Sequence, residues 1–118
     1  MGRQEKVISG IISIVGAASA GNNTVTKSKG LDGVASVART GTGAITVTLD
    51  DAWVECHGIS ADYQTAGART CRITSHDVAS AKTIVITTLD DALAAADVPN
   101  GSTDYIHLIA ILKNSTVR

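Results

Sequence analysis

Aromatic residues are scarce in this sequence. They make up 3% of its 118 residues: phenylalanine is absent, and the inventory is Trp53, Tyr63 and Tyr105. A folded core must therefore be built from Ile, Val, Leu and Ala, whose side chains bury less apolar surface than aromatic rings do. We predict that association between subunits contributes to the stability of such a thin core.

An excess of charge of one sign is also lacking. Ten Lys and Arg residues against eleven Asp and Glu residues give a net charge of −1, and the basic residues do not cluster. Because nucleic acid favours a basic stripe, we expect no nucleic-acid partner. The two cysteines, Cys56 and Cys71, are too few for a disulfide-scaffolded miniprotein, although they could pair with each other.

Long apolar runs are absent as well. The run that starts at Val7 is interrupted by serine and glycine and falls far short of the ~20 residues that a membrane span requires, so we expect no membrane partner. Arg3 and Lys6 before this run, with Ala18-Ser19-Ala20 after it, also fit a signal peptide. We expect an uncleaved structural segment; the alternative is a signal peptide on a secreted or periplasmic enzyme.

The clearest pattern that is present lies at residues 34–49, VASVARTGTGAITVTL, and predicts a β-hairpin. Ile45, Val47 and Leu49 alternate with two threonines, which is the period of a strand with one buried face. Gly41 and Gly43 are expected to supply the positive φ angles that a tight reversal needs.

Further apolar or alternating segments recur along the chain, as in sandwiches and barrels. We predict an all-β fold, an antiparallel sandwich that is jelly-roll-like, in which 1–22 form an extended N-terminal arm and linker and 23–118 form the sandwich domain. One segment, residues 90–97 (DDALAAAD), predicts a short helical turn because an Asp precedes Leu and Ala. The expected strands outside the hairpin lie at 6–15, 24–27, 52–59, 69–75, 82–88 and 105–112.

Two of these strands, KVISGIISIV (6–15) and YIHLIAIL (105–112), are apolar on both faces. Such a strand is either buried on both sides of its sheet or clasped by a neighbouring subunit, and for 6–15 we favour a neighbour. The predicted subunit or capsid interface consists of Val7, Ile8, Ile11, Ile12, Ile14, Val15, Tyr105, His107, Ile109 and Ile111.

Cys56, His57, Cys71 and His76 are the residues that most resemble a metal-ligand set. Their spacing fits no known zinc finger, and adjacent residues on a strand point to opposite faces, so we expect no metal site. The acidic pairs Asp50-Asp51 and Asp90-Asp91 lack the spacing of an EF-hand loop and fit turns better.

Signatures of catalysis are weak throughout. The chain has no G-x-S-x-G elbow, and Gly41-Thr42-Gly43 is not followed by the G-K-[ST] of a phosphate-binding loop. We therefore expect no enzyme, no catalytic residues and no cofactor.

The string VARTGTGAITVTL at residues 37–49 resembles the V-x-R-T-G-x-G-x-Y-T-[IV]-T-[LF] hairpin of small structural proteins of tailed-bacteriophage virions, with Ile45 where that pattern usually has Tyr. Residues 105–115, YIHLIAILKNS, look like the closing strand of those proteins, and residues 95–101 look like the loop before it. The resemblance implies a jelly-roll-like virion domain, usually a homotrimer, that decorates a capsid or ends a fibre and has no catalytic residues.

The function we expect first is that of a capsid decoration, or cement, protein. It would bind itself and the major capsid protein, stabilise a phage head as an oligomer, and sit on the capsid surface of a virion assembled in the host cytoplasm. The alternative is a tail fibre tip or other tail component for receptor recognition, for which Tyr63 and Trp53 are the candidate loop aromatics.

Overall fold

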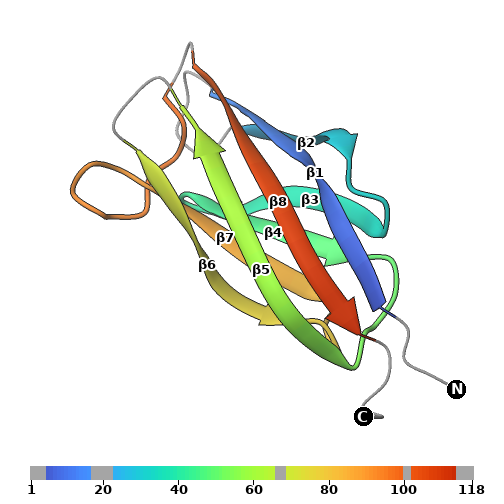
Figure 1. Ribbon diagram of the computed structural model, residues 1–118. Helices are drawn as coiled ribbons and strands as arrows, with labels where there is room; N and C mark the ends of the chain where they lie inside the picture. Colours follow the sequence, from blue (N-terminus) through green and yellow to red (C-terminus); the bar gives the residue numbers. More distant parts are fainter. Residues whose placement is uncertain (1–4, 17–22, 66–68, 100–101, 114–118) are drawn as a thin grey trace, which may run out of the picture.

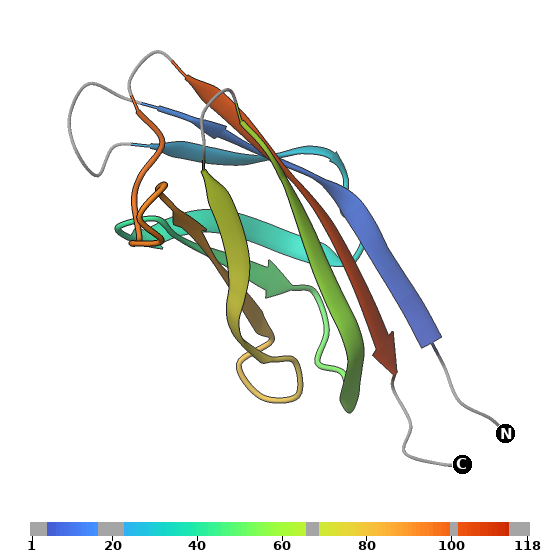
Figure 2. The same ribbon diagram turned by 60° about the vertical axis from the view of Figure 1, so that its left-hand side comes forward.

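Two four-stranded antiparallel sheets pack face to face in the computed structural model, which describes residues 5–16, 23–65, 69–99 and 102–113 (Figures 1 and 2). Sheet A has the strand order β2-β1-β8-β5, and sheet B has the order β3-β4-β7-β6. The predicted all-β antiparallel sandwich is therefore confirmed. The strands are β1 (Glu5–Val15), β2 (Thr24–Gly30), β3 (Val34–Gly41), β4 (Ala44–Leu49), β5 (Glu55–Gln64), β6 (Thr70–Asp77), β7 (Thr83–Leu89) and β8 (Thr103–Lys113).

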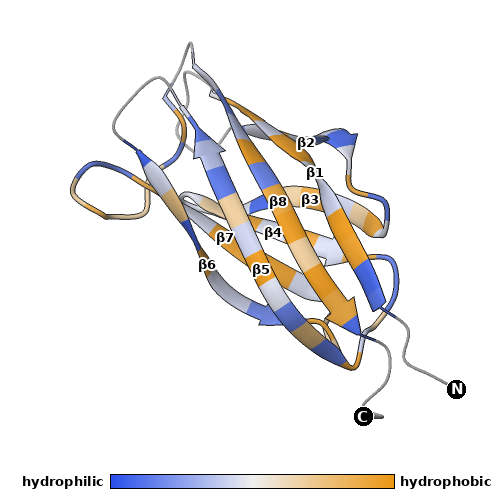
Figure 3. Cartoon of the chain, viewed as in Figure 1, coloured by the Kyte–Doolittle hydropathy of each residue, from blue (hydrophilic) through white to orange (hydrophobic). Residues whose placement is uncertain are grey.

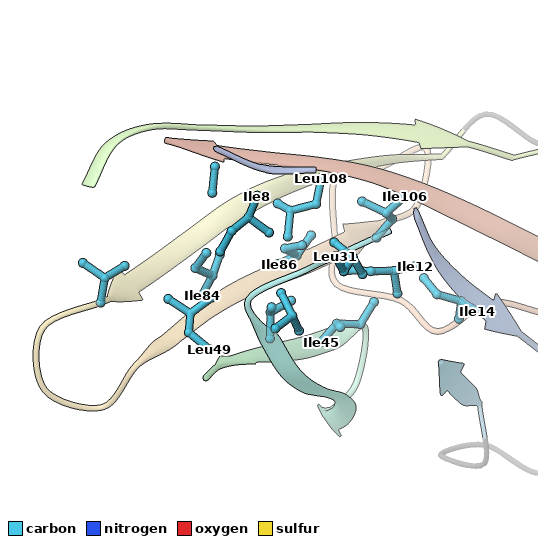
Figure 4. Close-up of a cluster of buried hydrophobic side chains, with 14 of the residues drawn as sticks. Ile8, Ile12, Ile14, Leu31, Ile45, Leu49, Ile84, Ile86, Ile106 and Leu108 are labelled. Carbon is cyan, nitrogen blue, oxygen red and sulfur yellow. The ribbon is translucent and has the colours of Figure 1, made fainter. Parts of the chain in front are cut away.

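The core lies between the sheets and is aliphatic, because alternate residues of each strand point inward. In β4 and β7 the alternation is regular, with Val47, Ile84 and Ile86 fully buried. Trp53 and Tyr63 pack only against the margin of this cluster. The inward side chains of both sheets interdigitate in Figure 4, where Ile8, Ile12, Ile14, Leu31, Ile45, Leu49, Ile84, Ile86, Ile106 and Leu108 are labelled.

The predicted hairpin is strands β3 and β4. Gly43 has a φ of 68°, as predicted, and the backbone N–H of Thr88 donates to its carbonyl oxygen at 2.8 Å. The prediction is wrong for Gly41, which has no positive φ and instead pairs with Ala44 at the end of the ladder. The reversal therefore needs glycine at only one of the two positions.

β1 is an inner strand of sheet A instead of a free arm. It pairs with β8 along its whole length, from Glu5 opposite Lys113 to Val15 opposite Thr103, and its second half also pairs with β2. Most of its ladder hydrogen bonds are thus made within the chain. Most of the expected linker after β1, residues 17–22, lies outside the described residues. β8 lies between β1 and β5, the central position that its two apolar faces predicted.

The helical turn predicted near residues 90–97 does not form, and the described part of the chain has no helix, so none is long and apolar enough to cross a membrane. Asp90 does cap a turn, because its Oδ1 accepts hydrogen bonds from the backbone N–H groups of Ala92 (2.9 Å) and Ala94 (3.0 Å). Leu93 then adopts a φ of 63°, which stops a right-handed helix, and Ala95 bridges back to Leu89.

Irregular pairing is confined to the four edge strands. The ladders of β2, β5 and β6 each contain one register shift and that of β3 contains two, and each shift leaves a residue without a partner across the ladder. The inner pairs β1–β8 and β4–β7 are regular. Bulges twist an edge strand and discourage strand addition from another chain. The unpaired residues are Ser28, Ala35, Thr40, His57 and Thr74.

Candidate interaction surface

Strand alternation divides the ten predicted interface residues into two groups. Ile8, Ile12 and Ile14 face inward and are at most 1% exposed, so they belong to the core and not to a surface. The sequence could not separate the two groups, because both faces of β1 are apolar. The seven on the outer face of sheet A are Val7, Ile11, Val15, Tyr105, His107, Ile109 and Ile111.

The outer face of sheet A carries an apolar stripe along β1 and β8, in which Ser9, Ser13 and His107 lie among the apolar residues. Val7 lies opposite Ile111, and Ile109 lies between Ser9 of β1 and Ser60 of β5. Val7 is 57% exposed and Ile109 is 36% exposed. Figure 3 shows hydrophobic residues along most of both strands, those that face the core included. The small neighbours leave the aliphatic side chains accessible.

Further along the same face, a shallow hollow of about 330 Å³ lies between Ile11, Lys29, Gln64 and Tyr105. His107 is exposed here, and its Nε2 lies 3.3 Å from Ser9 Oγ. The hollow thus combines the apolar surfaces of Tyr105 and Ile11 with the polar groups of Lys29 on β2 and Gln64 on β5.

Charged residues frame the apolar stripe instead of interrupting it. At one end, Lys113 Nζ lies 4.0 Å from Glu5 Oε2. Towards the other end, Lys29 of β2 pairs with Ile11, and Asp62 of β5 pairs with His107. Lys29 and Asp62 are exposed, and neither forms an ion pair with another residue in the described ranges.

The outer face of sheet B is different, because hydroxyl groups dominate it. Thr40 Oγ1 lies 2.8 Å from Thr46 Oγ1, and Thr74 is hydrogen-bonded to Thr87. None of the exposed large hydrophobic side chains of the described residues lies on a strand of this sheet. The hydroxyl-bearing residues on it include Ser36, Thr40, Thr46, Thr48, Thr74, Ser75, Thr83 and Thr87.

Asp97 joins the hairpin to the loop before β8. Its carboxylate accepts two hydrogen bonds from Arg39, Nε to Oδ1 and Nη2 to Oδ2, both at 2.9 Å, and a third from the backbone N–H of Gly43 at 2.8 Å. The hydrogen bond to Asp97 raises the pKa of Arg39 above its ordinary value. Nearby, Asn23 and Val98 exchange two hydrogen bonds of 3.0 and 2.7 Å. The hairpin turn is thus clamped by a loop far away in sequence.

A second hollow, of about 310 Å³, contains Asp90, Asp91, Asp97 and Arg69. Two of its three carboxylates are committed elsewhere: Asp90 caps its own turn, and Asp97 holds Arg39. The described residues contain no group of three or more acidic, His or Cys side chains placed to hold a metal ion. The described residues of this hollow therefore do not form a set of metal ligands.

A buried ionic network links the two sheets near the start of β8. Asp104 is fully buried, and its Oδ2 accepts hydrogen bonds from the hydroxyl of Tyr63 and from Arg69 Nη2, the latter at 2.7 Å. Arg69 Nη2 also lies 2.7 Å from Thr65 Oγ1. Burial, and then the hydrogen bond to Asp104, raises the pKa of Tyr63. Burial lowers the pKa of Arg69, but its hydrogen bonds to Asp104 and Tyr63 outweigh this effect, and the pKa is raised.

Sequence patterns alone did not reveal this network, although a signal for it was present. Asp104 continues the inward alternation of Ile106 and Leu108, which places a carboxylate on a core face. A buried carboxylate requires a charged or hydrogen-bonding partner. Which residue supplies that partner depends on how β5, β6 and β8 meet, and no local pattern shows it.

The cysteine and histidine residues do not form the metal-ligand set that their types suggested. Cys56 and Cys71 are free and half-buried. Cys71 Sγ lies 3.8 Å from the carbonyl oxygen of Ala61, and burial, helped by Asp62, raises the pKa of its thiol. His57 lies 3.1 Å from Glu55 on the exposed bulge of β5. The thiols and imidazoles thus have separate local contacts.

Comparisons with protein-family models, with curated protein sequences and with solved structures find no match to this chain. The resemblance to virion proteins therefore stays a prediction from residues 37–49, 95–101 and 105–115.

Proposed function

We propose that this chain is a non-enzymatic structural protein of a tailed-phage virion, which decorates the capsid surface as an oligomer and stabilises the head. Its partners are other copies of itself and the major capsid protein. The hairpin at residues 37–49 and the closing segment at residues 105–115 support the virion class through their likeness to such proteins. A jelly-roll-like description of the sandwich is part of the proposal: the pairing of β1 with β8 along their whole length supports it, whereas the pairs β1–β2, β3–β4 and β6–β7 within the sheets count against it.

The observation that carries the proposal is the contrast between the two outer faces. Of the six exposed large hydrophobic residues in the described ranges, four lie on the outer face of sheet A: Val7, Val15, Tyr105 and Ile109. The other two, Val54 and Leu93, lie in loops, and none lies on sheet B. A contiguous apolar patch on one face, rimmed by polar residues, is typical of an association surface.

The clamp at Asp97 gives further support. The hairpin and the loop before β8 each resemble virion proteins, and in this structure they are one unit because Asp97 binds both Arg39 and Gly43. These contacts fix the hairpin turn of sheet B to the loop before β8, which suits a structural module better than a mobile recognition loop.

The alternative of a receptor-binding tail tip has less support. It relied on Tyr63 and Trp53 as loop aromatics, but Tyr63 lies in β5 and is hydrogen-bonded to Asp104, while Trp53 packs against the core. Both residues are therefore half-buried and held by contacts within the sandwich.

The test uses heads of the cognate phage assembled without this chain. Purified wild-type protein should co-sediment with the heads and raise the temperature at which they release their contents. Ile109→Lys, which places a charge in the apolar stripe, should lower occupancy at least tenfold because separate subunits bind without avidity. Ser36→Lys adds the same charge to sheet B and is the matched control. Heads that bind no wild-type protein, or that bind Ile109→Lys equally well, would contradict the proposal.

A further inference from the structure

The proposed function does not specify which surface covers the apolar stripe on sheet A, or how the two surfaces are oriented. The bulges in β2, β3, β5 and β6 discourage strand addition at each sheet edge. Packing of a face against a face is the geometry that remains, and two sheets can pack in this way about 10 Å apart.

Pairs of opposite charge lie across the line between β1 and β8 on this face. Across the sheet from β2 to β5, one row reads Lys29, Ile11, His107 and Asp62, with opposite charges at its two ends. At the other end of the stripe, Lys113 of β8 pairs with Glu5 of β1 on one side and with Glu55 of β5 on the other. Lys29 and Asp62, and likewise Glu5 and Lys113, lie on opposite sides of the line between β1 and β8.

We propose that the outer face of sheet A is covered by the same face of a second copy, related by a two-fold axis that runs along the strands between β1 and β8. This proposal takes one thing from the proposed function, namely that the outer face of sheet A is the association surface. The rotation exchanges β1 with β8 and β2 with β5. It places Lys29 opposite Asp62 of the partner subunit and Glu5 opposite Lys113 of the partner subunit, each twice. In the apolar stripe it brings Val7 against Ile111 of the partner subunit.

Other two-fold arrangements of this face lose the charge match. An axis that crosses the strands puts β2 opposite β2 of the partner subunit, so that Lys29 faces Lys29 of the partner subunit or no charge at all. Like charges across an interface are unfavourable, and opposite charges fix its register. The pattern of charges therefore selects the axis along the strands.

The face is large enough for such a pair. β1 and β8 have 11 residues each, which corresponds to a length of roughly 36 Å, and four strands about 4.8 Å apart give a width of roughly 14 Å. Because β2 borders only the second half of β1, two copies cover roughly 900 Å² in projection, and more in accessible area, which is where specific interfaces begin. The pair differs from the homotrimer that the resemblance implies.

Complementary charge reversals test the proposal by sedimentation equilibrium of the full chain at low salt. Lys29→Glu sets like charges against Asp62 of the partner subunit, and Asp62→Lys does so against Lys29 of the partner subunit. Each variant alone should dimerise at least tenfold more weakly than the wild type. An equimolar mixture of the two restores both contacts and should recover affinity to within about threefold of the wild type.

Arg72→Glu and Asp91→Lys are the matched controls, because they reverse exposed charges away from sheet A. Alone or mixed, they should leave dimerisation unchanged. A mixture of Lys29→Glu and Asp62→Lys that is no tighter than either variant would overturn the proposed axis, as would a wild-type monomer or a wild-type trimer. Heads that bind a wild-type trimer would keep the proposed function and reject the two-fold pair. A wild-type dimer that binds no heads would do the reverse.

Discussion

Asp104 of β8 accepts a hydrogen bond from Arg69 at 2.7 Å, and the pair links sheet A to the segment that enters sheet B. Because Asp104 is fully buried, removing it leaves the guanidinium group without its counter-charge in a low-dielectric site. Asp104→Ala should therefore lower the free energy of unfolding by about 3 kcal/mol in urea titrations. The exposed Asp91→Ala is the control, and equal losses in the two variants would contradict this account.

Replacing both partners should cost less than the sum of the single changes. Asp104 Oδ1 and Arg69 Nε are buried without a hydrogen-bond partner among the described residues, so the network is only partly satisfied. The double variant Asp104→Leu with Arg69→Met removes both charges together. A double-mutant cycle measured by urea unfolding should give a coupling of at least about 1 kcal/mol. Additive losses would show that the two side chains act independently.

The raised pKa of Tyr63 predicts that the protein loses stability at alkaline pH. This pKa is raised in the folded protein above the ordinary value of 10.0, first by burial and then by the hydrogen bond to Asp104. The folded state therefore holds the phenolic proton more tightly than the unfolded chain. This contribution is complete below pH ~10 and is lost as the pH rises further.

The measurement is the urea midpoint of the wild type and of Tyr63→Phe at pH 8 and pH 11. The wild type should be more stable than the variant at pH 8, and this advantage should shrink by pH 11. Tyr105→Phe, on the outer face, is the control and should keep the alkaline loss. An advantage that grows with pH would be incompatible with the raised pKa.

Gly43 and Gly41 form a matched pair for testing the hairpin turn. A Cβ at Gly43 would lie 2.7 Å from the carbonyl oxygen of Thr88 and would sit on a residue with a φ of 68°. Gly43→Ala should cost about 2 kcal/mol or more in urea unfolding. A Cβ at Gly41 would meet only Ala44 Cβ, at 3.7 Å, so Gly41→Ala should cost less than about 0.5 kcal/mol. Equal costs would count against the turn as described.

The thiol of Cys71 should react slowly. Burial, together with Asp62, raises its pKa above the ordinary 9.0, which lowers the fraction of reactive thiolate at pH 8. In a Cys56→Ala background, iodoacetamide should modify folded protein at least tenfold more slowly than protein in urea, as followed by mass spectrometry. Adding Asp62→Asn should speed the folded reaction. Equal rates in folded and unfolded protein would refute the prediction.

Local patterns were sufficient for much of the fold. The alternation of Ile45, Val47 and Leu49 predicted β4, and the scarcity of aromatic residues predicted an aliphatic core. Both predictions depend on the period of a strand and on side-chain volume, which are properties of neighbouring residues. The local signal was ambiguous at residues 90–97, where an Asp cap is compatible with a helix or with a turn. A turn forms because Leu93 adopts a left-handed conformation.

Partners distant in sequence could not be predicted in the same way. Asp97 lies 58 residues from Arg39, and Tyr63 lies 41 residues from Asp104. These contacts need strands and loops that are distant in sequence to lie side by side, as β5 and β8 do in sheet A. β1 shows the same limit: its sequence is equally suited to a neighbour's sheet and to its own.

The sequence by itself determined that this is an all-β chain with an aliphatic core, a Gly43 turn and two strands that are apolar on both faces. Hydrophobic periodicity and backbone sterics act over a few residues, so these properties can be seen locally. The tertiary structure alone decided that β1 pairs with β8, that Ile8, Ile12 and Ile14 are core while Val7 and Ile109 are surface, and that Lys29 and Asp62 lie in one row across the sheet. Strand order determines the first of these, and strand register determines the other two, because a shift of one residue would exchange the two faces.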